Sequence, residues 1–107
     1  MKNHKKTASL NWEQGQVKGF VGKNLIALKN GSLKMVKVLP FAVYPTHKHP
    51  SKTEFVFVLE GRPKITIGES VCDGEKNDFF TLAKNLKHCI ENPTDTECIL
   101  LVGAIVE

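Results

Sequence analysis

Three of the four histidines lie at spacings that suit a metal site. His47 and His49 are separated by one residue, and side chains at i and i+2 of a β-strand point to the same face. Glu54 follows five residues later, and a turn at residues 50–52 would bring its carboxylate back beside the two imidazoles. Two histidines and one carboxylate suit a divalent first-row metal with open coordination positions, and His88 could supply a fourth ligand.

The same residues permit other interpretations. The histidines could be ordinary surface side chains and Glu54 a surface acid, because an H-x-H pair by itself arises easily by chance. A second alternative is an intact site that is purely structural or that takes up metal adventitiously. His4 lies in a lysine-rich tail, and Cys89 would point away from the strand face that carries His88, so neither is expected to be a ligand.

The spacing of these histidines and of Glu54 also resembles the sequence motifs of a known protein family. The segment from Phe41 to Gly61 resembles the first motif of the cupin superfamily, G-x5-H-x-H-x3–4-E-x6-G, with His47, His49 and Glu54 at the ligand positions and Phe41 in place of the first glycine. The second cupin motif is G-x5-P-x-G-x2-H-x3-N. It is matched at His88 and Asn92 and replaced at Asn77, Ala83 and Asn85. All four ligand positions agree, and asparagine is the residue that best replaces glycine where φ is positive.

The resemblance implies a small double-stranded β-helix, the jelly-roll cupin barrel, over about residues 33–106. It also implies one divalent transition metal per chain, such as Fe, Mn, Ni or Zn. The implied ligands are His47, His49, Glu54 and His88. The superfamily contains dioxygenases, isomerases, epimerases, decarboxylases and lyases as well as proteins without known activity, so the resemblance selects no single reaction.

The elements that must position these residues have the pattern of short β-strands. Apolar runs of four to nine residues alternate with turn residues, which favours an all-β antiparallel sandwich or barrel. The runs cover residues 17–21, 25–28, 33–39, 41–44, 54–59, 64–67, 79–82, 87–90 and 98–106. Residues 77–86 also have a helical pattern that Asn77 could cap, but two strands flanking a turn near Asn85 agree better with a ligand role for His88.

The chain of 107 residues is predicted to be a single cupin domain, residues 1–107, with a flexible segment at residues 1–9. Apolar residues make up 41% and charged residues 24%, which excludes a disordered, collagen-like or coiled-coil chain. No apolar run reaches the roughly 20 residues of a spanning helix, and no signal-peptide core follows the N-terminal lysines. With three cysteines and no C-x-x-C pair, we expect a cytoplasmic protein with free thiols and no membrane partner.

Charge is distributed unevenly along the chain, although the formal net charge is only +4. Residues 1–53 hold ten lysines and one acid, whereas residues 54–107 hold five basic and ten acidic residues. A basic half can indicate a nucleic-acid partner, but these lysines are spread out, no recognition helix is evident and arginine is absent from this half. We therefore predict no nucleic-acid partner.

The strand at residues 54–59 divides its side chains between two faces. If Glu54 points into the barrel, the period of two sends alternate side chains inward with it and the others outward. The inward residues are Val56 and Val58, and the outward residues are Phe55, Phe57 and Leu59. Three large apolar side chains on an outer face predict a homodimer.

The leading functional prediction is a metalloenzyme that acts on a small molecule. We expect the metal to face a mainly apolar pocket lined by Val56, Val58, Ile90 and one face of residues 99–106. Such a pocket suits a small enol, diol or keto-acid that chelates the metal through oxygen, and it favours an oxygen-dependent dioxygenase with Glu54 as catalytic base. The alternatives are a non-catalytic cupin that binds or senses a small ligand and a cupin that resembles sugar isomerases or epimerases.

Overall fold

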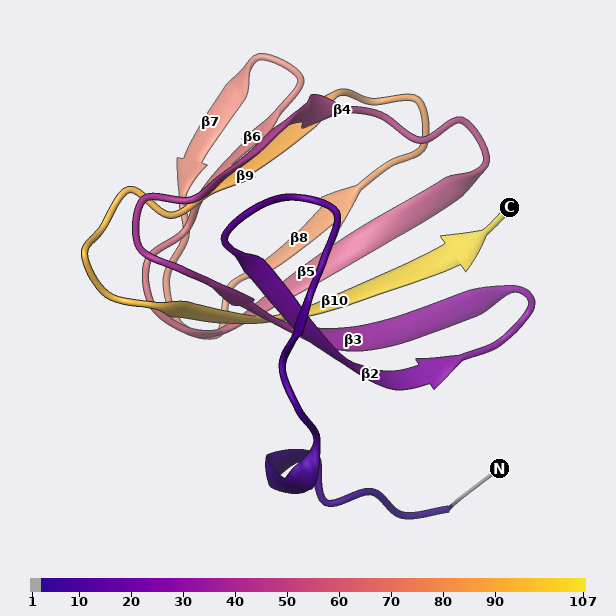
Figure 1. Cartoon of the computed structure of the whole chain (residues 1–107). Coiled ribbons are helices and arrows are strands. Elements are labelled where there is room, and N and C mark those ends of the chain that lie inside the picture. The colour runs from indigo at the N-terminus through magenta and orange to yellow at the C-terminus, as the bar shows by residue number, and fades with distance from the viewer. Residues whose placement is uncertain (1–2) are drawn as a thin grey trace.

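The computed structural model describes residues 3–107, which form two antiparallel β-sheets packed face to face (Figure 1). The six-stranded sheet has the order β1-β2-β3-β10-β5-β8, and the four-stranded sheet has the order β4-β9-β6-β7. The strands are β1 (Glu13–Gln14), β2 (Phe20–Ala27), β3 (Gly31–Val38), β4 (Val43–His47), β5 (Lys52–Glu60), β6 (Lys64–Ile67), β7 (Ser70–Asp73), β8 (Phe79–Leu82), β9 (His88–Glu91) and β10 (Cys98–Val106). This architecture confirms the predicted all-β jelly-roll barrel.

Strand β10 organises the six-stranded sheet because it lies between β3 and β5. Leu100 stands opposite Val36 on β3 and Val58 on β5. These three side chains are buried in one cluster with Ile65 and Ile90 of the four-stranded sheet. The core therefore fills the space between the two sheets, and alternate residues of each strand point into it.

One end of the barrel is closed by hydrogen bonds around Asn92, whose side chain is 1% exposed. Its amide nitrogen donates to the carbonyl oxygens of Val38, Leu39 and Thr96 at 3.1, 3.3 and 2.7 Å. Its amide oxygen accepts from the backbone N–H of Thr94 at 3.0 Å. Asn92 thus ties the end of β3 to the loop that precedes β10 and satisfies backbone groups that burial would otherwise leave unpaired.

The helical alternative at residues 77–86 does not form, and the favoured arrangement of two strands flanking a turn near Asn85 is confirmed. The structure has strand β8 there, followed by a turn that leads to His88. The φ angles of Asn77 and Asn85 are 73° and 65°, so both asparagines adopt the left-handed conformation at positions where the cupin motif has glycine. Phe41 also has a positive φ, 62°, although a bulky side chain is disfavoured there.

The apolar runs at residues 64–67, 79–82 and 98–106 coincide with β6, β8 and β10. Two strands have no counterpart among the predicted runs. Strand β7 is exposed along its whole length and lacks an apolar alternation, and β1 is only two residues long. Both lie at sheet edges, where burial leaves little pattern in the sequence.

The outer face of the six-stranded sheet is apolar and partly uncovered. Phe55 lies over Gly103, and its ring would overlap any side chain at that position. The ring of Phe79, which is 59% exposed, lies 6.0 Å from the ring of Phe55. The outward side chains of Phe57 and Leu59 are half-buried. The homodimer stays a prediction.

The N-terminal segment packs beside β2 and β3. The ammonium groups of Lys23 and Lys37 lie 4.4 and 4.5 Å from the centre of the Trp12 ring. Lys23 is 8% exposed and also donates to the carbonyl of Thr7 at 2.9 Å. Of the segment predicted to be flexible, residues 1–2 lie outside the described residues, and flexibility of the rest stays a prediction. Within residues 3–107, no helix is long and apolar enough to cross a membrane.

Candidate metal centre

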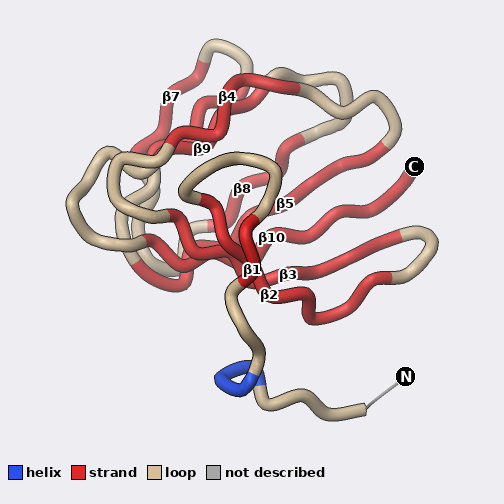
Figure 2. The backbone as a smooth tube through the Cα atoms, in the orientation of Figure 1, coloured by secondary structure: helices blue, strands red, loops and turns tan. Residues whose placement is uncertain are grey.

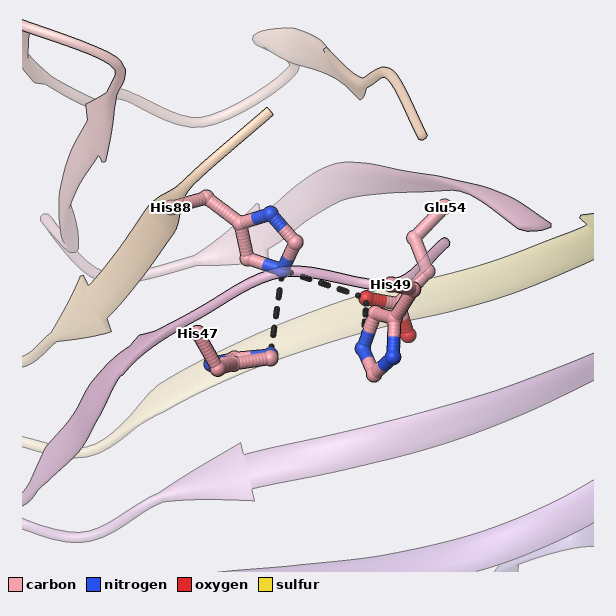
Figure 3. A group of neighbouring side chains, drawn as sticks. All are labelled: His47, His49, Glu54 and His88. Atoms are coloured by element: carbon pink, nitrogen blue, oxygen red, sulfur yellow. Dashed lines mark hydrogen bonds and ion pairs between the residues drawn. The ribbon is translucent and has the colours of Figure 1, made fainter. Parts of the chain in front are cut away.

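The four predicted metal ligands come together in one cluster (Figure 3). His88 begins β9 and Asn92 follows its last residue, so the cluster lies at the other end of this strand, which we call the open end of the barrel. His47 is the last residue of β4 and pairs with His88, the first residue of β9, whereas Glu54 lies on β5 of the other sheet. His49 lies in the connection from β4 to β5. The expectation of one continuous strand carrying His47 and His49 is therefore wrong, because β4 ends at His47. The two rings still converge, but through this connection.

The ligand atoms are spaced as the ligands of one ion would be. His47 Nε2 and His88 Nε2 are 3.0 Å apart, and Glu54 Oε1 lies 3.1 Å from His49 Nε2 and 3.3 Å from His88 Nε2. All four ligand atoms lie within 4.8 Å of one another. Two ligands about 2.1 Å from a metal and at right angles are about 3.0 Å apart. The group therefore fits one first-row divalent metal, and its nitrogen and oxygen donors suit several such metals.

Backbone carbonyls orient two of the imidazoles. His47 Nδ1 donates to the carbonyl of Pro45 at 2.8 Å, and His88 Nδ1 donates to the carbonyl of Leu86 at 3.1 Å. Because a carbonyl can only accept, Nδ1 of each ring carries a proton, and Nε2 is the atom that each ring presents to the cluster. Two Nε2 atoms 3.0 Å apart can share a proton in a hydrogen bond or can both direct lone pairs at one metal ion, and the second arrangement is the one expected of metal ligands.

The electrostatics of the cluster favour the protonation states that bind metal. Burial opposes ionisation of Glu54, but the hydrogen bond from His88 and the nearby His49 and Lys52 outweigh it and hold the pKa of Glu54 below its usual value. Burial lowers the pKa of His49 despite the neighbouring carboxylate of Glu54. An ionised carboxylate and a neutral imidazole are the metal-binding forms, so both shifts extend metal binding toward acidic pH.

A cavity of about 470 Å³ opens beside the cluster, with His47, His49 and Glu54 in its wall. This volume lies within the range of about 300–1,000 Å³ that is usual for small-molecule sites. Its apolar wall is formed by Phe20, Val36, Leu82, Ile90, Leu100 and Val102. The loop between β1 and β2 adds Gly15 and Gln16 to the same wall, and Figure 2 shows how this loop arches away from the sheet edge.

The predicted pocket lining is right for Ile90 and for strand β10, but it is wrong for Val56 and Val58. Both valines pack in the core between the sheets, and neither lines the cavity. The prediction also missed Lys34, although the period of two places it on the same strand face as Val36. Nothing in the sequence indicated that residues 13–16 line the site, because no local pattern connects them with the histidines.

A two-sheet β-barrel with three histidines and one glutamate gathered at its open end defines a cupin with a group of residues positioned to bind a metal. The sequence profile described as Cupin domain matches residues 34–103, and the chain belongs to this family. A probable germin-like protein, subfamily 2 member 5, from Arabidopsis thaliana is 29% identical over an alignment of 92 residues, and the match covers 81% of this chain and 42% of that protein. The chain spans about two fifths of the length of the curated relatives it matches.

Two solved structures superpose with a TM-score of 0.87. A predicted oxalate decarboxylase from Thermotoga maritima is 17% identical, and the match covers 95% of this chain and 97% of that one. The polyketide cyclase RemF from Streptomyces resistomycificus is 19% identical, and the match covers 100% of this chain and 81% of that one. At such identities the likeness shows the fold alone, and the two names describe different reactions on one barrel.

Proposed function

We propose that this protein is a metal-dependent cupin enzyme that acts on a small molecule, with oxygen-dependent dioxygenase chemistry as the leading reaction. The observation that carries the proposal is the convergence of three histidines and one glutamate beside a cavity with room for a small molecule. Four protein ligands leave further positions free on a six-coordinate metal. The cavity lies where a substrate would have to be to occupy them.

The roles of the chain's own residues follow from their contacts. The Nδ1 bonds of His47 and His88 fix the orientation of these rings before any ligand binds. Glu54 directs Oε1 at the histidines and keeps Oε2 on the side of Lys52, 3.9 Å from Nζ, so Oε2 is available to take a proton from a substrate. The apolar side chains of the cavity would pack against the apolar part of a substrate. A bound metal would supply a Lewis acid and, if it is iron or manganese, a redox centre.

The test is oxygen uptake by protein loaded separately with Fe(II), Mn(II), Ni(II) or Zn(II) and offered a panel of small enols, diols and keto-acids. We expect uptake with a redox metal and at least one compound, and none with Zn(II). His47→Ala should abolish it, whereas His4→Ala, a change in the exposed tail, should leave it unchanged. Glu54→Gln should retain substrate binding and lose turnover if the carboxylate acts as a base.

Two results would replace the dioxygenase proposal. Tight binding of one compound without turnover under any metal would support a cupin that binds or senses a small ligand. Oxygen-independent conversion of a sugar would support an activity like that of isomerases or epimerases.

A further inference from the structure

Two lysines share the cavity with the metal ligands. Lys34 lies on β3 and Lys52 on β5, on opposite sides of the central strand β10, and both line the cavity. Lys34 stands opposite Val102, and Lys52 precedes Glu54 by two residues, so each lysine is on the inner face of its strand. Both lysines can therefore contact a ligand bound in the cavity.

The two lysines differ in whether they form an ion pair with an acidic residue. Lys52 lies 3.9 Å from Glu54 Oε2, on the side of the carboxylate away from the histidine contacts made by Oε1. Lys34 forms no ion pair with any residue in the part of the chain that the structure describes, residues 3–107. The cavity therefore presents one lysine placed at the metal cluster and a second with an unused charge.

The charges of the cavity favour an anion once a metal is bound. Its other charged side chains are Glu13 and Glu54, which together offset the two lysines. A divalent metal then leaves the site with a net positive charge that attracts an anion. Lys34 and Glu13 are exposed, so this attraction is weakened by salt. If a substrate binds the metal through oxygen atoms at one end, an anionic group at its other end would be attracted to the lysines.

We propose that the substrate is a small carboxylic acid that has a carboxylate for Lys34 and Lys52 in addition to the oxygens that chelate the metal. This inference rests on the proposed function, because it names the substrate class of the same site. Among the described residues no arginine and no helix N-terminus lines the cavity, so the two lysines are the groups that would hold this anionic end, and the phosphonate comparison below separates carboxylate from phosphate. The cavity of about 470 Å³ has room for a chain of a few carbons between the two ends.

The first test compares ligands rather than variants. Zn(II)-loaded protein, which cannot turn over in a redox reaction, is titrated by calorimetry with 2-oxoglutarate and with 2-oxopentanoate. The two acids share the chelating end and the chain length and differ only in the distal carboxylate. We expect 2-oxoglutarate to bind about tenfold more tightly at low ionic strength, and the difference to shrink as salt is added. Equal affinity would overturn the proposal.

The analogue with a distal phosphonate should bind no more tightly than 2-oxoglutarate, and a clear preference for it would also overturn the carboxylate assignment.

The second test assigns the preference to the lysines. Lys34→Met and Lys52→Met keep the aliphatic stem and remove the charge, and each should reduce the preference for 2-oxoglutarate by about three- to tenfold. Affinity for 2-oxopentanoate should change little. Lys29→Met removes a lysine that is exposed and outside the cavity, so it is the matched control for net charge and should behave as the wild type. A preference that survives in both cavity variants would contradict the proposal.

Failure of this inference can be told apart from failure of the proposed function. Titration with Zn(II) alone and with the neutral chelator acetohydroxamic acid measures the metal site without a carboxylate. If both bind and the distal carboxylate has no effect, the substrate class is wrong and the metal site stands. If Zn(II) does not bind, both proposals are wrong.

Discussion

The two ends of the barrel are built from the same strands but from different kinds of side chain. At the closed end, Val38, Val58, Ile65 and Cys98 are 0% exposed. At the open end, β3 and β5 continue into Lys34 and Glu54, which face a cavity. The closed end is stable because apolar surface is buried and polar groups are paired. The open end gathers imidazole nitrogens and a carboxylate, the donor atoms that a metal ion takes. Fold stability and ligand binding are therefore located at opposite ends.

The largest effect is expected from a change at the closed end. Ile65→Ala removes a fully buried side chain and should lower the free energy of unfolding by about 2–5 kcal/mol, because a cavity replaces packed atoms. Urea denaturation of metal-free protein measures this loss. The folded fraction should bind metal as the wild type does, since Ile65 does not line the metal cavity. A matching fall in metal affinity would show that the two ends are coupled.

A change at the open end should have the converse result. His47→Ala should weaken metal binding by at least about 100-fold, because even the outer partners of metal ligands contribute about 10- to 100-fold. The unfolding free energy of the metal-free variant should change by less than about 1 kcal/mol, since His47 is a partly exposed side chain. Competition with a fluorescent chelator gives the affinity, and His4→Ala is the control. If metal affinity is unchanged, His47 is not a ligand.

Removal of the metal tests whether the closed end suffices for folding. At a metal concentration of about 100 times Kd, binding contributes about 2.7 kcal/mol, so chelation should lower Tm by about 10–20 °C. The chelated protein should keep its far-ultraviolet circular dichroism spectrum and unfold cooperatively, because the core between the sheets contains no metal ligand other than His88. Unfolding of the whole chain on chelation would contradict this expectation.

Acidification should affect the open end alone. The pKa of His49 is below its usual value of 6.5, so the unfolded chain binds the proton more readily than the folded one. Stability of the metal-free protein should be complete above pH 6.5 and decrease as the pH falls through the folded-state pKa. Glu54, whose pKa is below 4.5, adds a second decrease as the pH falls from 4.5 through its folded-state value. Urea midpoints measured between pH 7.5 and about pH 4 give the curve. The decrease in stability that begins below pH 6.5 should be absent in His49→Ala and present in Ile65→Ala.

The smallest effect on either end is expected from the outer face of the six-stranded sheet. Phe79 is 59% exposed beside Phe55, and we expect this surface to contact a second copy of the chain. Phe79→Lys should convert a dimer to a monomer in light scattering at micromolar concentration. Metal affinity should be unchanged because the side chain does not reach the cavity. A wild-type protein that is monomeric under these conditions would refute the dimer.

The sequence predicted those features that depend on short-range periodicity or on motif spacing. Alternation located β6, β8 and β10, and the H-x-H, Glu54 and His88 spacing identified the cluster that the structure brings together. It did not predict β7, because an exposed edge strand has no buried face to leave a pattern. It also assigned Val56 to the cavity, because alternation tells which face a residue is on but not how deep along the barrel it lies.

The cavity wall draws on two separable stretches of chain. The family match covers residues 34–103, whereas Glu13–Gln14, Gln16 and Asn24, which also line the cavity, lie outside it. Strand β1 pairs with β2 through Glu13 with Gly22 and Gln14 with Val21. A protein engineer could therefore graft a different N-terminal segment onto this barrel and alter ligand choice without redesigning the metal motif. By the same logic, two chains with identical metal motifs need not share a substrate.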